Sequence, residues 1–222
     1  MKKYKDMIQH ILDNGVESDD RTGVGTLSVF GYQTRYDLNE GFPIVTTKKT
    51  PFKTAIAELL WVIEGSTDER RLAELTYGQD RSELVGKTTI WQENADNQGK
   101  SLGFQNTDTV KELGKVYGFL WRKFDNQNFD QLKWVINEIK RNPNSRRLLI
   151  SGWNPLVMHE QSLPACHTFF QFYVRNHKLD GQLYMRSNDV FLGNPFNVVF
   201  YSALIHLVAK ECGYEVGELV VS

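Results

Sequence analysis

The chain of 222 residues has little cysteine, almost no net charge and no long apolar run, and each lack excludes a class of protein. Two cysteines, Cys166 and Cys212, are too few for a disulfide scaffold or a structural zinc site. The 26 Lys and Arg nearly balance the 27 Asp and Glu, so general nucleic-acid binding is not expected. The longest largely apolar stretch, 198–209, contains His206 and is too short to span a membrane.

What is present is the composition of an ordinary globular domain. Hydrophobic residues make up 41% and charged residues 24%, which excludes a disordered, collagen-like or coiled-coil chain. No repeat or linker divides the sequence, so a single domain over 1–222 is expected. The charged, amphipathic N-terminus is not a signal peptide. Together with the scarce cysteine it predicts a cytoplasmic protein, in the host cytoplasm if the chain is viral.

Hydrophobic periodicity predicts four helices: 2–13, Pro51 to Gly65 with Thr50 as N-cap, 129–141, and Pro195 to Cys212. The last is apolar almost all round, which is typical of a helix buried at the centre. Strands are expected within 20–38, 146–153, 165–174 and 179–187. The fold class is therefore α+β, with a mixed β-sheet, a buried central helix and flanking helices. The polar, irregular segment 76–115 is predicted to be a functional surface or insertion rather than core.

Two of these strands form a predicted hairpin whose loop residues are 176 and 177. Counting back along the strands places Cys166 opposite Ser187 and His167 opposite Arg186. In this register the large apolar side chains of both strands share one face, which supports it. A thiol, a guanidinium, a hydroxyl and an imidazole would thus gather at one end of the hairpin.

Such a grouping indicates a nucleophilic cysteine. A thiolate beside Arg186 is expected to have a lowered pKa, and the thiolate is the reactive form. The alternative is that Cys166 is a small buried hydrophobic residue. Its position after Pro164, at the start of a strand with Arg186 within reach, favours the nucleophile. Cys212 lacks such neighbours and is interpreted as a packing residue.

Several arginines suggest an anion site. Arg21, Arg146, Arg147 and Arg186, the last followed by Ser187, carry guanidinium groups that suit a phosphate dianion. The alternative for each is a solvated surface charge.

Two other polar residues lie on predicted helices. The helix neighbours of Glu58 are apolar, so its carboxyl is expected to be desolvated, with a raised pKa that suits proton transfer. A surface glutamate whose side chain reaches water is the alternative. Asn197 lies in the first turn of the apolar helix, where its amide could read a heterocycle edge such as that of uracil. Alternatively, Asn197 holds a loop.

The sequence resembles the thymidylate synthase family over essentially its whole length. The resemblance rests on DDRTGVGTLSVFG, GFPIVTTKK, ELLW, VYGFLWR, SRR, GWNP, LPACH, QFYV, RSNDVFLGNPFN and YEVGEL, in that order. It implies that family's fold, with one sheet face used for dimerisation. It also implies dUMP and the co-substrate 5,10-methylenetetrahydrofolate, no metal, and no nucleic-acid or membrane partner.

The resemblance further implies three groups of site residues. The catalytic group is Cys166, which would add to carbon 6 of uracil, with Glu58, Tyr117, Asn197 and Arg186. The substrate-binding group is Arg21, Ser187, Asp189 and His167, with Arg146 and Arg147 contributed by the partner of a homodimer. The folate-binding group is Lys48, Trp91, Asp189, Leu192, Gly193 and Phe196.

Departures from the family pattern keep alternatives open. Gln92, Lys115 and Met185 replace the usual Asp, Pro and Gln, and MRSND resembles pyrimidine nucleotide hydroxymethylases, which release tetrahydrofolate. Asn197 is a poor match to a cytosine edge, so a uridylate hydroxymethylase is the main alternative. The family's sugar-binding His-x-Tyr segment and C-terminal lid are expected to be absent. A non-catalytic nucleotide-binding homologue is therefore a third hypothesis.

Overall fold

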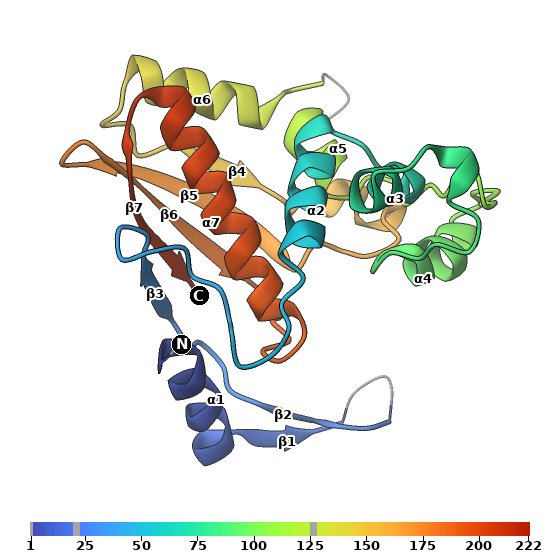
Figure 1. Ribbon diagram of the computed structural model, residues 1–222, viewed down its shortest axis with the longest axis horizontal. Helices are drawn as coiled ribbons and strands as arrows, with labels where there is room; N and C mark the ends of the chain where they lie inside the picture. Colours follow the sequence, from blue (N-terminus) through green and yellow to red (C-terminus); the bar gives the residue numbers. More distant parts are fainter. Residues whose placement is uncertain (1, 20–22, 125–127) are drawn as a thin grey trace.

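A five-stranded mixed sheet forms the centre of the protein in a computed structural model that describes residues 2–19, 23–124 and 128–222. The strand order is β3-β7-β6-β5-β4 (Figure 1). Strands β6 and β7 pair in parallel, whereas the other neighbours are antiparallel. The strands are β3 Thr34–Asp37, β4 Leu149–Ser151, β5 His167–Arg175, β6 Lys178–Met185 and β7 Glu215–Val221. The predicted α+β class with a mixed sheet is confirmed.

Helix α7 (Gly193–Cys212) crosses one face of this sheet and is buried along most of its length, as its apolar sequence predicts (Figure 1). It begins two residues before the predicted Pro195, because the carbonyl of Asp189 accepts hydrogen bonds from the N–H groups of Gly193 and Asn194. Gly213, with φ 78°, ends it in the left-handed conformation.

Helices flank α7 and the sheet, and two of them begin later than predicted. Helix α2 begins at Phe52, and the hydroxyl of Thr50 donates to the carbonyl of Val45 at 2.9 Å, so Thr50 does not cap it. Helix α6 begins two residues after Phe129, where the carboxylate of Asp130 accepts the N–H of Lys133. The helices are α1 Lys2–Asn14, α2 Phe52–Glu64, α3 Glu69–Tyr77, α4 Gln92–Asn94, α5 Tyr117–Arg122 and α6 Gln131–Arg141.

Residues 76–115 form a helical lobe beside α2 (Figure 1). It contains the 3₁₀ turn η1 (Arg81–Glu83) and the π-helical turn η2 (Ala95–Gly99). Four of its apolar side chains are buried: Leu84, Trp91, Ala95 and Leu113. The prediction that this segment lies outside the core is therefore wrong for these residues.

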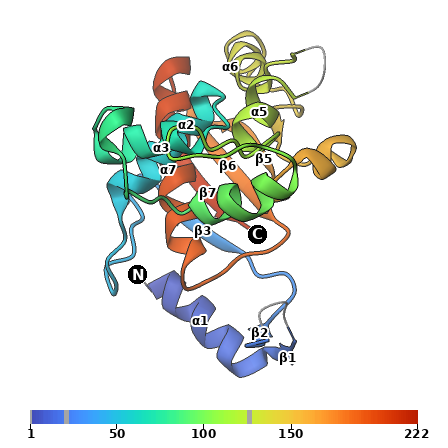
Figure 2. The same cartoon turned by 90° about the vertical axis from the view of Figure 1, so that its right-hand side faces the viewer.

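The N-terminal part stands apart from the sheet. Helix α1 and the hairpin of β1 (Val16–Ser18) with β2 (Thr26–Ser28) extend below it, as both views show (Figures 1 and 2). Tyr4 and Met7 of α1 pack against Val45 in a small separate core. No helix in the described ranges is long and apolar enough to cross a bilayer.

Candidate active site

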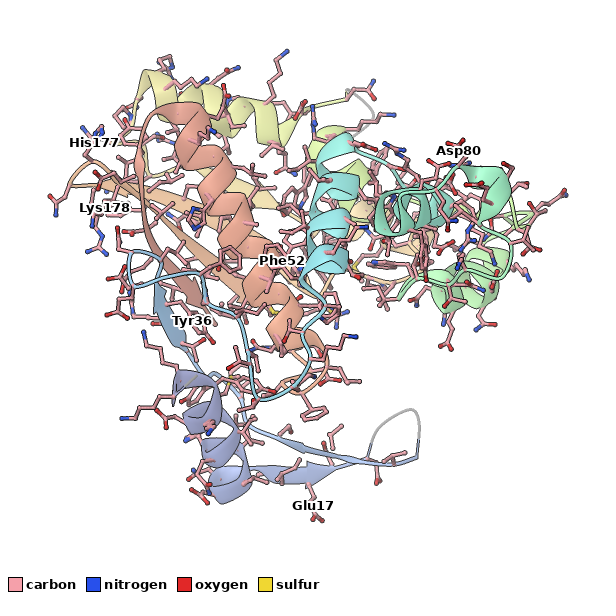
Figure 3. All side chains as sticks on the ribbon, viewed as in Figure 1. Glu17, Tyr36, Phe52, Asp80, His177 and Lys178 are labelled. Carbon is pink, nitrogen blue, oxygen red and sulfur yellow. The ribbon has the colours of Figure 1, made fainter. Side chains whose placement is uncertain are left out.

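The β5–β6 hairpin has the predicted turn. Asn176 and His177 both have positive φ, 49° and 61°, as a two-residue type I′ turn requires. Figure 3 shows His177 and Lys178 at this turn. Arg175 pairs with Lys178 and the strands stay in the predicted register as far as Phe169.

Near its other end the hairpin departs from the prediction. The register shifts between His167 and Phe169, so His167 lies opposite Met185 rather than Arg186. The N–H of Arg186 instead donates to the carbonyl of Cys166 at 3.0 Å. Such a β-bulge adds a residue to one strand and redirects the side chains beyond it. Cys166 thus faces Arg186, not Ser187, across the hairpin.

A pocket of about 750 Å³ opens at this end of the hairpin. Its walls come from the centre of α2, the start of α5, the ends of β5 and β6, the first turn of α7, and segments 48–51 and 90–94. Its lining includes twelve residues predicted from the sequence: Lys48, Glu58, Trp91, Tyr117, Cys166, His167, Ser187, Asp189, Leu192, Gly193, Phe196 and Asn197. The fold therefore brings most of the predicted catalytic and folate-binding residues together.

Of the predicted arginines that the structure describes, none lines this pocket. The side chain of Arg186 donates to the carbonyls of Ala165 at 2.9 Å and Pro164 at 2.8 Å. It therefore fixes the backbone that leads to the cysteine. Arg146 and Arg147 are exposed on the turn before β4. The prediction for Arg21 falls outside the described residues.

Glu58 on α2 is half-buried in the pocket. The indole N–H of Trp91 donates to its Oε1 at 2.6 Å. Burial raises the pKa of Glu58, and the Trp91 hydrogen bond opposes this only in part, so the pKa stays above its ordinary value. This agrees with the prediction of a desolvated carboxyl suited to proton transfer.

Tyr117 contacts the backbone at the cysteine. Its hydroxyl accepts hydrogen bonds from the N–H groups of Cys166 at 2.8 Å and His167 at 3.2 Å. Both lone pairs are thereby used, so the O–H proton is the group that Tyr117 can still donate. Burial raises the pKa of Tyr117 well above its ordinary value, which keeps the hydroxyl protonated.

His167 is enclosed by aromatic rings. Its Nδ1 lies 3.1 Å from the hydroxyl of Tyr201, and its ring centroid is 5.1 Å from that of Tyr117. Burial lowers the pKa of His167 to about 4, so the imidazole is neutral at pH 7. Asn197 hydrogen-bonds His167 and also donates to the sulfur of Met185 at 3.5 Å. Asn197 therefore lies in the pocket, on a wall of neutral polar groups.

Some lining residues were missed from the sequence: Lys49, Thr50, Pro51, Ile90, Asn94, Leu163, Met185 and Pro195. Many of them adjoin a predicted site residue in the chain. Ile90, for example, precedes Trp91. Segment 48–51 reaches the pocket because the ammonium of Lys48 hydrogen-bonds the carbonyl of Phe191 and lies 4.2 Å from the centre of its ring.

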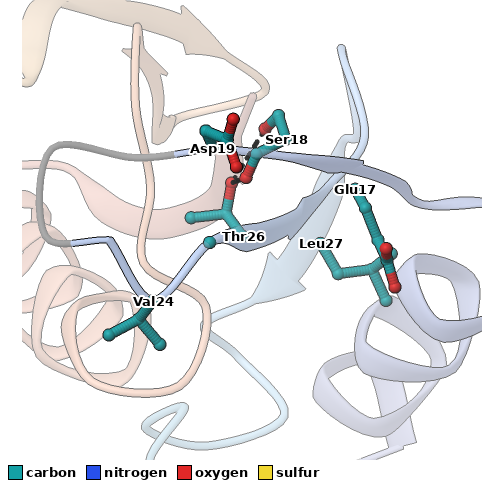
Figure 4. A pocket seen from close by; sticks show the side chains of 7 residues that line it. Glu17, Ser18, Asp19, Val24, Thr26 and Leu27 are labelled. Atoms are coloured by element: carbon teal, nitrogen blue, oxygen red, sulfur yellow. Dashed lines mark hydrogen bonds between the residues drawn. The ribbon is translucent and has the colours of Figure 1, made fainter.

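A second hollow lies on the β1–β2 hairpin (Figure 4). Figure 4 shows the hydroxyls of Ser18 and Thr26 in a hydrogen bond across the two strands, at 3.0 Å. Polar surface dominates this hollow, and among the described residues its lining, which includes Glu17 and Leu27, contains none of the predicted site residues. The candidate active site is therefore the pocket at the cysteine.

The pocket brings a cysteine together with a carboxyl and a phenol, a combination that suits an enzyme with nucleophilic and acid–base catalysis. The family model described as thymidylate synthase matches residues 2–222. The chain is 49% identical over 222 residues to the thymidylate synthase of Enterobacteria phage T4, covering 100% of this chain and 74% of the relative. The crystal structure of thymidylate synthase from T4 phage superposes with a TM-score of 0.91 at 47% identity, with the same coverage. The chain belongs to the thymidylate synthase family.

Proposed function

We propose that this chain transfers a one-carbon unit from 5,10-methylenetetrahydrofolate to carbon 5 of dUMP and reduces it, yielding dTMP and dihydrofolate. The main support for this activity is the set of side chains in the pocket. The pocket holds a cysteine, a desolvated carboxyl and a phenol together, which are Cys166, Glu58 and Tyr117. The similarity to thymidylate synthases supports the same activity.

The cysteine would activate an otherwise poor nucleophile. The sulfur of Cys166 forms a bond to carbon 6 of uracil, and the electrons of the 5,6 double bond move toward the carbonyl oxygen on carbon 4 as an enolate. Carbon 5 then bonds to the methylene carbon of the folate, while the bond from that carbon to N10 breaks and its electrons stay on the nitrogen. Asn197 would bind the uracil edge, and the amide and hydroxyl groups of the pocket would stabilise the negative charge.

Glu58 and Tyr117 suit the proton transfers that follow. The proton on carbon 5 leaves to a base, and cleavage of the bond to tetrahydrofolate gives an exocyclic methylene. A hydride from tetrahydrofolate then adds to that methylene, the carbon–sulfur bond breaks, and Cys166 is released as thiolate. Because the carboxyl of Glu58 has a raised pKa, it can accept and return protons near neutral pH.

The phosphate would be bound with help from a second subunit. Four apolar or aromatic side chains on the sheet face opposite α7 are exposed: Leu149, Phe169, Tyr173 and Tyr184. The rings of Phe169 and Tyr184 stack with centroids 5.5 Å apart. This exposed apolar surface supports a homodimer through the sheet face. Arg146 and Arg147 lie outside this chain's own pocket, and we propose that they reach the phosphate site of the partner subunit.

We further propose that 1–222 forms a single catalytic domain that acts in the cytoplasm. Both cysteines are free, which suits a reducing compartment, and one large core joins the sheet, α2, α5 and α7.

A uridylate hydroxymethylase remains the second candidate, because Met185 lines the pocket where the family usually has Gln. Mass analysis of both products from one incubation with dUMP separates the candidates. Dihydrofolate with a 5-methyl nucleotide is the expected result. Tetrahydrofolate with a 5-hydroxymethyl nucleotide would establish the hydroxymethylase. If no hydrogen is released from carbon 5 of dUMP, the chain is a non-catalytic homologue.

A further inference from the structure

A charged pair is fully buried at the start of helix α3, beside the helical lobe and outside the pocket. Glu69 and Arg70 open helix α3, and their side chains are 0% and 2% exposed. The guanidinium of Arg70 binds both carboxylate oxygens of Glu69, at 2.7 and 2.8 Å. Breaking such a pair is costly, yet keeping it adds little stability compared with apolar packing. A role in fixing local geometry would explain a buried pair better than stability does.

The pair holds the segment that leads to the pocket. The Nη1 group of Arg70 donates a hydrogen bond to the carbonyl of Lys87 at 3.1 Å. It also donates a longer one, of 3.5 Å, to the carbonyl of Leu84. The hydroxyl of Thr89 donates to Oε1 of Glu69 at 2.5 Å. Residues 84–89 are therefore tied to the first turn of α3 at three points.

Thr89 continues this connection to the pocket. While its hydroxyl proton is given to Glu69, its oxygen accepts the backbone N–H of Trp91 at 3.2 Å. The indole of Trp91 then donates to Glu58 at 2.6 Å and contacts the ring of Tyr117 edge-on, with centroids 6.0 Å apart. Hydrogen bonds to the backbone and to the indole of Trp91 thus connect the buried pair, through that residue, to the carboxyl in the pocket.

Building on the proposed function, we propose that Glu69, Arg70 and Thr89 are positioning residues, which hold the indole of Trp91 against Glu58. None of the three lines the pocket, so they act through Trp91. Holding Trp91 in place matters because a small displacement of a catalytic group lowers the reaction rate strongly. The indole hydrogen bond also lowers the pKa of Glu58, so its loosening should raise that pKa further.

The decisive variant is Thr89→Val, which keeps the shape of the side chain and leaves the ion pair intact. Thr88→Val is the matched control, since Thr88 is the neighbouring residue and its side chain is exposed. Thr89→Ser restores the hydroxyl. The readout is fluorine NMR of the full chain labelled with 5-fluorotryptophan, over a pH titration without substrate. Trp91→Phe identifies the resonance of Trp91 among the five tryptophans.

The Trp91 resonance should titrate with Glu58 in the parent chain, and Glu58→Gln should abolish that titration. In Thr89→Val we expect a displaced resonance and a higher titration midpoint, with parent values in Thr88→Val and in Thr89→Ser. The kcat of Thr89→Val should fall roughly tenfold. A Trp91 titration in Thr89→Val identical to that in Thr88→Val would overturn the proposal, as would an unchanged kcat beside a displaced Trp91. A parent chain without turnover would refute the proposed function instead, and the NMR comparison would still decide the positioning role.

Discussion

The inner end of the pocket, which is the part formed by Glu58, Tyr117, Cys166 and His167, differs in its surroundings from the predicted phosphate-binding arginines. At the inner end, burial favours the neutral form of three side chains. It raises the pKa of Glu58 and of Tyr117, and it lowers the pKa of His167. Arg146 and Arg147, by contrast, are exposed and stay outside the pocket. One chain therefore assembles the groups that would handle protons and the cysteine, whereas the groups that would bind the anion lie on its surface.

Under the proposed function, covalent chemistry and anion binding would be carried out by separate parts of the chain. The inner end is built from α2, α5 and α7, which belong to one hydrophobic core. The arginines sit on a turn at the edge of the sheet, beside its exposed aromatic face. If Arg146 and Arg147 bind the phosphate of a partner subunit, as proposed, changes at the inner end should act within one subunit and changes at these arginines should act on the partner.

The largest effect is expected at the cysteine. Cys166→Ser should lower turnover of dUMP by at least roughly 10⁴-fold, because serine lacks a comparable nucleophile at neutral pH. Steady-state assays of dihydrofolate formation measure this loss. Cys212→Ser is the matched control, since Cys212 lies at the far end of α7 from the pocket. An equal loss of turnover in both variants would contradict the role of Cys166 as the nucleophile.

The next largest effect is expected at Glu58. Glu58→Gln should reduce kcat by about 10²- to 10³-fold, within the range of a general acid–base group. The acid limb of the pH–kcat profile should disappear, because the raised pKa of Glu58 produces it. Glu64→Gln, on the exposed end of the same helix, serves as the control. A Glu58→Gln profile that keeps its acid limb would assign that limb to another group.

Mixing two inactive variants tests whether Arg146 and Arg147 serve the site of a partner subunit. Cys166→Ser has intact arginines, and the double variant Arg146→Ala/Arg147→Ala has an intact cysteine. In a heterodimer one of the two sites would be complete, so a re-equilibrated equal mixture should recover about one quarter of parental activity. Activity is measured after reversible denaturation of the mixture. If the mixture recovers no activity, the arginines serve the pocket of their own chain.

A smaller effect concerns stability. A folded pKa of Glu58 above the unfolded value means that the folded chain binds more protons between the two values. Its contribution to stability is therefore complete below the unfolded pKa and lost as pH rises through the folded pKa. Glu58→Gln removes that loss and should stabilise the protein by about 1 kcal/mol at pH 8 relative to the parent. Urea unfolding at pH 5 and pH 8 measures this, and an equal gain at both would contradict it.

Local sequence signals predicted the elements better than their connections. The turn at Asn176 and His177 and the buried helix α7 follow from local preference and apolar content. The bulge after His167 was missed, because it depends on how the strand end meets the loop of Arg186. Thr50 has the chemistry of an N-cap, yet its hydroxyl is used by Val45 instead.

The site was predicted mainly through motifs, and its internal geometry was not. The apolar neighbours of Glu58 indicated desolvation, and burial raises the pKa of Glu58 in agreement with this. Its hydrogen bond to Trp91 spans 33 positions and could not be read from either segment alone. Segment 76–115 has no clear hydrophobic periodicity. The burial of Leu84 and Leu113 depends on how the lobe packs against other helices, so it could not be predicted from the sequence.

The proposed function depends on a bond between the thiol of Cys166 and a bound uridylate. Incubation with 5-fluoro-dUMP and 5,10-methylenetetrahydrofolate, followed by mass spectrometry of the intact chain and its peptides, tests this directly. Fluorine on carbon 5 replaces the hydrogen that must leave as a proton, so the adduct should accumulate. We expect one added nucleotide and one added folate on the peptide that contains Cys166. An unmodified Cys166 in folded protein that binds the nucleotide would contradict it.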